Sequence, residues 1–159
     1  MKFTALLLML ALSPASSGAY QAADPPFTTS GAFVALSVAD LAASGRWYRE
    51  KLGLRVVMEP PRTNEAAVMV LEGGGLIVEL LQHNGARPRS AAVPNARESF
   101  RVHGIFKAGL IVDDLARTIA ALRSRGVEIA YGPFPKSAAQ RANAIVRDNA
   151  GNLIQFFGK

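Results

Sequence analysis

The apolar residues of this chain fall into segments of two kinds. Stretches rich in β-branched residues, such as residues 34–38 and 76–82, have the length and composition of strands. Residues 41–52 and 115–125 instead place apolar side chains three or four positions apart, which is the spacing of one helix face. Each helical segment follows an aspartate suited to an N-terminal cap and precedes a glycine suited to a C-terminal cap. These caps are Asp40 and Asp114, and Gly53 and Gly126.

The segments occur twice in the same order, at an offset of about 75 residues. The run FVALSVADL, which begins at Phe33, resembles KAGLIVDDL, which begins at Lys107. Later in each copy, GLIVELL from Gly75 resembles GNLIQFF from Gly151. The strands expected in the two copies cover residues 34–38, 55–59, 66–71 and 76–82, then 110–112, 128–131, 142–147 and 153–157.

These elements predict an α+β fold made of two tandem βαβββ modules, with the helices outside the sheet layer. The modules cover about residues 31–82 and 104–159, and a linker without periodicity covers residues 83–103. A module of this size is half of a domain, so we expect the two copies to fold together as one domain over residues 31–159.

The N-terminus indicates export. Residues 1–19 combine a positive start at Lys2, a short apolar run and small residues before a cleavage point after Ala19, which together are typical of a secretory signal peptide. A buried N-terminal helix is the alternative. Residues 20–30 form an extended polar lead, and no apolar run reaches the roughly 18 residues of a membrane span. We expect a periplasmic or secreted protein without membrane insertion after the signal is removed.

The amino-acid composition limits which ligands and macromolecular partners are expected. The chain has no cysteine, so its stability has to come from the core and not from disulfides. The formal net charge is +6, but the basic residues are dispersed and no aromatic residues interleave them. This distribution argues against nucleic acid binding. It leaves a bias towards anionic ligands.

The repeated residues resemble the vicinal oxygen chelate superfamily, which contains glyoxalase I, bleomycin-resistance proteins and extradiol dioxygenases. The resemblance is carried by VALSVADLAASGRWYREKLGLRVV in the first copy and by LIVDDL and DNAGNLIQFF in the second. It covers residues 33–157. It implies that the two copies pair their sheets into a cup around the site, and that homodimers form by ordinary pairing or by swapping halves.

In metal-using members of this superfamily, the first and last strand of each copy each supply one ligand. The resemblance maps the first-strand positions onto Phe33 and Lys107, and the last-strand positions onto Glu79 and Gln155. Only Glu79 is a strong donor for a divalent cation, and a protonated Lys107 repels one. We therefore expect no metal and no other cofactor at these positions.

The same residues predict a ligand site of another kind. Glu79 and Lys107 hold equivalent places in the two copies, so they could form an ion pair across the cup, either as a structural replacement for the metal or as ligand contacts. His83, which follows the strand of Glu79, is a candidate contact at the mouth of the cup. The predicted ligand-binding residues are Phe33, Glu79, His83, Lys107 and Gln155.

Several functions remain open at this point. The first is an exported protein with a degenerate metal site that binds a small organic ligand, with a bias towards anions. The second is a metal-independent isomerase or lyase acting next to a carbonyl, with Glu79 as the base and Lys107 as the stabilising charge. The third is a metalloenzyme whose site is displaced towards His83 or His103. The last is an interaction module in which the duplicated sheets serve only as a scaffold.

Overall fold

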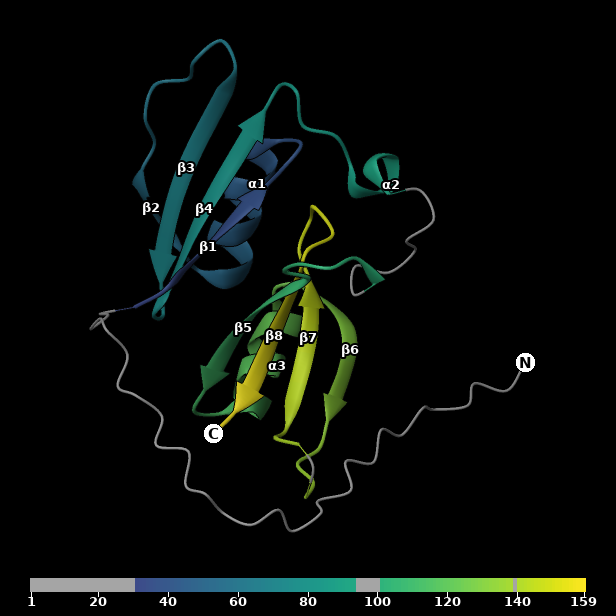
Figure 1. Ribbon diagram of the computed structural model, residues 1–159. Helices are drawn as coiled ribbons and strands as arrows, with labels where there is room; N and C mark the ends of the chain where they lie inside the picture. Colours follow the sequence, from purple (N-terminus) through teal and green to yellow (C-terminus); the bar gives the residue numbers. More distant parts are fainter. Residues whose placement is uncertain (1–30, 94–100, 139) are drawn as a thin grey trace, which may run out of the picture. The chain divides into compact units, whose positions relative to one another are not determined.

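Both βαβββ units are present in the computed structural model, which describes residues 31–93, 101–138 and 140–159 (Figure 1). The first unit consists of β1 (Phe33–Ser37), α1 (Leu41–Trp47), the π-helical turn η1 (Tyr48–Leu52), β2 (Arg55–Met58), β3 (Ala66–Gly73) and β4 (Leu76–His83). The second consists of β5 (Lys107–Val112), α3 (Leu115–Ser124), β6 (Glu128–Phe134), β7 (Asn143–Arg147) and β8 (Leu153–Gly158). The α+β fold with two tandem βαβββ modules is confirmed.

One helix was not predicted from the sequence, and one predicted segment lies outside the described residues. The linker contains a short helix, α2 (Arg89–Ala92), which no periodicity had indicated because it is a single turn. The predicted signal peptide and the polar lead, residues 1–30, lie outside the described residues. Among the helices of the described residues, none is long and apolar enough to span a bilayer.

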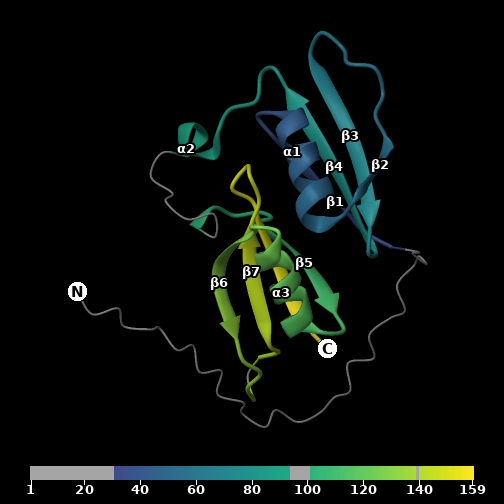
Figure 2. The same cartoon turned by 180° about the vertical axis from the view of Figure 1, so that it is seen from behind.

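Each unit builds one four-stranded mixed sheet. The strand order is β1-β4-β3-β2 in the first sheet and β5-β8-β7-β6 in the second. The two outer strands that begin the units, β1 and β5, pair in parallel with β4 and β8, and the other pairs are antiparallel. One helix covers one face of each sheet, α1 on the first and α3 on the second (Figure 2). No helix of the described residues covers the opposite face of either sheet.

The helix ends follow the predicted capping chemistry. The Asp40 carboxylate accepts a hydrogen bond of 2.8 Å from the Ala43 amide, and the Asp114 carboxylate accepts one of 2.8 Å from the Arg117 amide. These bonds satisfy amides that the first turn of a helix leaves unpaired. Gly53 and Gly126 have φ angles of 75° and 70°, so both occupy the left-handed region that favours glycine after a helix.

The two units share one core, built from the side chains that face the helices. Leu71, Val78 and Leu80 of the first unit and Val146 of the second are almost completely buried within it. Residues Val38, Leu41, Leu54, Leu122, Val127, Ile154 and Phe156 complete most of the cluster. Burial of apolar surface is the main stabilising contribution to folding, so this shared cluster joins the copies into one unit.

Two side-chain hydrogen bonds between described residues join the copies next to this core. The Tyr48 hydroxyl, at the start of η1, donates a hydrogen bond of 2.9 Å to the Asp148 carboxylate in the turn between β7 and β8. Asp148 is only 5% exposed and also accepts from the backbone amides of Ala150 and Asn152 and from the Asn152 side chain. In the same turn, the Asn149 amide donates to the Ser44 hydroxyl over 3.2 Å. Four hydrogen-bond donors therefore replace the water that the Asp148 carboxylate loses on burial.

A second pair of contacts relates the two helices by an approximate two-fold symmetry. The Lys51 ammonium donates to the Arg125 carbonyl, and the Arg125 guanidinium donates to the Lys51 carbonyl over 3.1 Å. Lys51 and Arg125 hold equivalent positions in the sequence repeat. The C-terminal ends of the two helical segments therefore lie side by side. Residues that are equivalent in the sequence repeat make equivalent contacts there.

We predict that Tyr48→Phe lowers the free energy of unfolding by about 1–2 kcal/mol, because a buried acceptor loses one of its four donors. Urea titration at neutral pH measures this change. Tyr131→Phe is the matched control, since Tyr131 is 45% exposed and its ring lies outside the shared core, and it should change stability by less than about 0.5 kcal/mol. Equal effects of the two variants would contradict the role assigned to the Tyr48 hydroxyl.

Stability should also fall in alkaline solution because of Tyr48. Burial, the negative charge of Asp148 and the hydrogen bond to it together raise the pKa of Tyr48 far above its ordinary value near 10. The unfolded chain therefore loses this proton first, and the stabilisation is complete below pH 10 and decreases as the pH rises above it. We expect a slope of up to about 1.4 kcal/mol per pH unit that is present in the wild type and absent in Tyr48→Phe.

Candidate functional site

The four positions that the sequence selected lie on the sheet faces turned away from the shared core. In β4, Val78 and Leu80 point into the core, so Glu79 between them points to the opposite face. In β8, Ile154 and Phe156 belong to the core, and Gln155 lies between them. The first-strand positions, Phe33 and Lys107, begin β1 and β5. We call the faces that carry Glu79 and Gln155 the outward faces.

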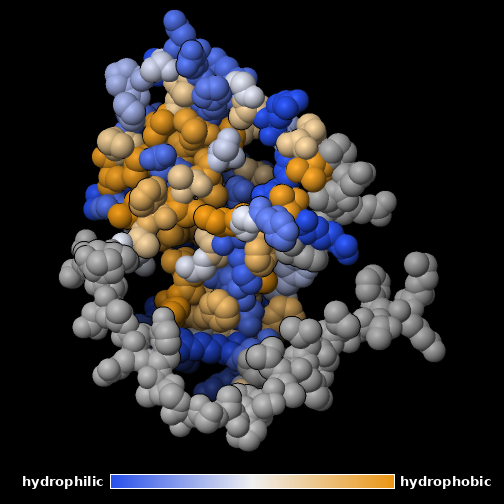
Figure 3. Space-filling view, in the orientation of Figure 1, coloured by the Kyte–Doolittle hydropathy of each residue, from blue (hydrophilic) through white to orange (hydrophobic). Residues whose placement is uncertain are grey.

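Glu79 is an isolated carboxylate on a largely apolar surface. Its cross-strand neighbours are Ala35 on β1 and Val70 on β3. Around it, Phe33 is 67% exposed and Met58 is 53% exposed, and Figure 3 shows the orange apolar patch over this sheet. No hydrogen bond or ion pair of Glu79 is found within the described part of the chain. A carboxylate in such surroundings is available to an external partner.

Gln155 is held more firmly. It is 6% exposed, and its side-chain Nε2 donates a hydrogen bond of 2.9 Å to Oδ1 of Asn143 on the neighbouring strand. The Asn143 amide in turn donates 2.9 Å to the Arg141 carbonyl. This chain of bonds fixes the orientation of the Gln155 amide and leaves its Oε1 as the remaining acceptor. Asn143 was not a sequence candidate, although its place opposite the last strand of the repeat could have indicated it.

The predicted ion pair between Glu79 and Lys107 is wrong for the single chain. Arg55–Glu72, Arg147–Glu128 and Lys159–Asp113 are ion pairs between described residues, and none between described residues joins Glu79 to Lys107. The Lys107 ammonium instead lies 5.1 Å from the centre of the Phe106 ring, which is a cation–π distance. The physical reason is the packing mode: the copies meet through their helix-facing sides, so equivalent residues on the outward faces do not face each other.

The two histidines lie at a strand end and in the segment before β5. His83 ends β4, is exposed, and its Nδ1 accepts a hydrogen bond of 3.0 Å from the Gly85 amide. His103 is exposed in a turn before β5. In the described ranges, no three His, Cys, Asp or Glu side chains come together as metal ligands.

The residues at the four positions do not fit a divalent metal. Phe33 offers no donor, Lys107 carries a positive charge, and the Gln155 amide is already bonded to Asn143. Glu79 remains as a single carboxylate, whereas a bound divalent ion in a catalytic site takes several nitrogen or oxygen ligands. The four side chains therefore offer one strong donor for a divalent cation.

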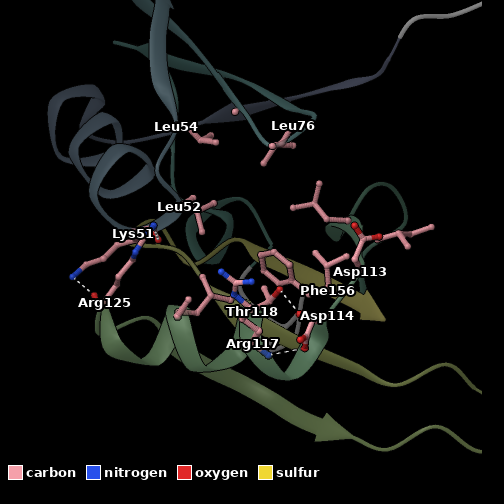
Figure 4. Close-up of a pocket in the computed structure, with 17 residues that line it drawn as sticks. Lys51, Leu52, Leu54, Leu76, Asp113, Asp114, Arg117, Thr118, Arg125 and Phe156 are labelled. Carbon is pink, nitrogen blue, oxygen red and sulfur yellow. Dashed lines mark hydrogen bonds between the residues drawn. The ribbon is translucent and has the colours of Figure 1, made fainter. Parts of the chain in front are cut away.

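The structure also contains a cavity that the sequence did not indicate. Its volume is about 460 Å³, and it lies on the helix-facing side, between the β3–β4 turn and α3 (Figure 4). Leu54, Leu76, Leu122 and Phe156 give it apolar walls, and Arg117 lines it from α3. A comparison of the two copies position by position could have found it, because small residues occupy the first-copy turn that borders it.

Comparison with known proteins identifies the family. The family model of the Glyoxalase/Bleomycin resistance protein/Dioxygenase superfamily matches residues 32–156. The chain belongs to this superfamily. The match covers both βαβββ units of this superfamily member and includes all four of the positions discussed above. A search of curated proteins found no significant match.

Several solved structures share the fold. A glyoxalase family protein from Enterococcus faecalis is similar with a TM-score of 0.64 and 21% identity, over 79% of this chain and 94% of that one. TnmS3, an antibiotic binding protein from Streptomyces sp. CB03234, is similar with a TM-score of 0.59 and 19% identity, over 82% and 96%. Glyoxalase I from Zea mays gives a TM-score of 0.59 and 17% identity, over 80% of this chain and 43% of that one. At these identities the likeness concerns the fold.

The isolation of Glu79 generates a stability prediction. Glu79→Leu should raise the free energy of unfolding by about 0.5–1 kcal/mol, because a charge without a partner is replaced by an apolar side chain among apolar neighbours. Thermal and urea unfolding measure it. Glu72→Leu, one strand away, removes the partner of Arg55 and should leave stability unchanged or slightly lower. A loss of stability in Glu79→Leu would show that the carboxylate has a structural role.

Proposed function

We propose that this superfamily member is an exported protein that binds a small organic ligand on its outward sheet faces without a metal. The observation that carries the proposal is the replacement of a ligand set by Phe33, Lys107, Glu79 and Gln155 on a surface rich in apolar side chains. The charged and amide groups would orient the ligand, and the apolar residues would bury its body. The antibiotic-binding protein with the same fold supports this class of function.

Each residue has a distinct part in this proposal. Phe33 supplies an exposed aromatic surface, and the Oε1 atom of Gln155 accepts a hydrogen bond in a fixed direction. Lys107 attracts anionic groups, in keeping with the positive net charge of the chain. Glu79 accepts hydrogen bonds from ligand donors. His83 lies at the end of the Glu79 strand, at the rim of this surface.

A second copy of the chain would close the site. The shared core of one chain lies between its helix-facing sides, so Glu79 and Gln155 point away from each other's unit. A pocket bounded by both types of outward face therefore needs the first unit of one copy and the second unit of another. The exposed apolar side chains around Glu79 favour burial against such a partner. A homodimer is part of the proposed function, and Glu79 and Lys107 would come together only there.

Binding is favoured over an isomerase or lyase reaction. A base and a stabilising charge have to reach the same substrate atoms. Within one chain Glu79 and Lys107 lie on separate sheets, so such a reaction would require the homodimer, whereas the apolar face around Glu79 can contact a ligand in each chain. The same separation applies to a displaced metal site, because His83 and His103 lie outside any cluster of ligands in the described residues. The periplasm or the medium would be the place of binding, as the predicted signal peptide indicates.

The metal-free part of this proposal is tested by equilibrium dialysis. Purified protein exposed to Zn²⁺, Ni²⁺ or Mn²⁺ should retain less than about 0.1 equivalent, because the positions offer one strong donor. The matched control combines Phe33→His, Lys107→His and Gln155→Glu, which restores donors at the same places and should retain more metal. Stoichiometric metal in the wild type would overturn the metal-free site.

The ligand part is tested by thermal shift with a panel of aromatic antibiotics and small organic acids. A ligand of the outward faces should raise the unfolding temperature of the wild type, and Lys107→Met should reduce the shift for anionic members of the panel. Sedimentation velocity on the same samples measures the dimer. A panel without any ligand, on a protein that stays monomeric, would contradict the proposal.

A further inference from the structure

The cavity of about 460 Å³ arises from a difference between two equivalent contact regions, which we call junctions. In each junction, the helix of one copy lies next to the turn before the last strand of the other copy. In one junction, Tyr48 of the first copy and Asn149 of the second fill the space between helix and turn. At the corresponding positions of the other junction, the repeat places Leu122 and Gly73. Both of these smaller residues line the cavity. The open space is thus the counterpart of a junction that is filled elsewhere in the same molecule.

Two further substitutions between the copies enlarge the same space. Trp47 on the first helix corresponds to Ala121 on α3, and Ala150 in the second turn corresponds to Gly74 in the first. Ala121 and Gly74 also line the cavity. Loss of this much side-chain volume at one of two equivalent junctions leaves apolar walls exposed, which is costly in a close-packed protein unless another molecule covers them.

The charged side chains around the cavity favour a ligand with an anionic group. Arg117 lies on the first turn of α3, and its guanidinium has no ion-pair or hydrogen-bond partner within the described part of the chain. Two carboxylates also line the cavity, but Asp113 pairs with Lys159 and Asp114 caps α3. The other two lining cations, Lys51 and Arg125, each donate to the backbone carbonyl of the other. Arg117 has no charged counterpart in the first copy, where the repeat places Ala43.

We infer that this cavity is a second binding site, for an organic carboxylate with an apolar body. The body would contact Leu76, Leu122 and Phe156, and the carboxylate would accept hydrogen bonds from the Arg117 guanidinium. The volume is within the range of about 300–1,000 Å³ that is usual for small-molecule sites. This site is on the helix-facing side, so it is separate from the outward faces and does not rest on the function proposed for them.

The test uses decanoate as the probe, titrated into the full chain and followed by calorimetry. The wild type should bind one decanoate per chain, and Ala121→Trp should weaken binding at least about tenfold by filling the cavity from an exposed helix position. Ala120→Trp is the matched control, because Ala120 is the preceding residue of α3, is exposed and does not line the cavity. Absence of binding to the wild type, or equal binding by both tryptophan variants, would overturn the site.

A second comparison tests the anion specificity. Arg117→Met should weaken decanoate about tenfold and leave decan-1-ol unchanged, whereas Arg123→Met, on the same helix outside the cavity, should affect neither. Equal affinity of wild type and Arg117→Met for decanoate would overturn the assignment of a carboxylate.

Discussion

The hydrogen bond between the Tyr48 hydroxyl and the Asp148 carboxylate connects the two halves of this fold. Both groups are buried. Either group without the other would destabilise the folded state, because a buried polar atom that has lost its hydration needs a hydrogen-bond partner. Asp148 also organises its own turn through two backbone amides and Asn152. The first helix therefore docks onto a turn of fixed shape, and this docking brings the helix-facing sides of both sheets into one core.

This mode of packing determines where ligands can bind. Residues that point into the shared core, such as Val78 and Ile154, stabilise the chain and are unavailable to a ligand. The alternating residues, Glu79 and Gln155, are excluded from the core and face outward. Duplication with this geometry gives two outward faces that belong to different sheets. Equivalent residues of the two outward faces, such as Glu79 and Gln155, can then approach one another only in an assembly of two copies.

Local signals in the sequence predicted the elements well, because each depends on neighbouring residues. The caps Asp40 and Asp114 and the left-handed Gly53 and Gly126 all occur where the pattern placed them. The site was harder to predict from the sequence. Strand β4 carries apolar residues on both faces, so the pattern does not show which face packs against the other copy. The expected Glu79–Lys107 pair is absent from the single chain for that reason: the repeat identifies corresponding strands, but it does not say which of their faces meet.

The two junctions between the copies show how a duplicated fold can separate stability from binding. One junction has large side chains and complete hydrogen bonding at Tyr48 and Asp148, so it contributes to the core. Its counterpart has Leu122 in place of Tyr48 and Gly73 in place of Asn149, and a cavity results. A symmetric molecule would need both junctions filled or both open. Because the first junction is sufficiently bonded to hold the halves together, the second can give up packing and leave room for a ligand. Arg117 at its wall, whose guanidinium has no partner among the described residues, favours an anionic ligand there.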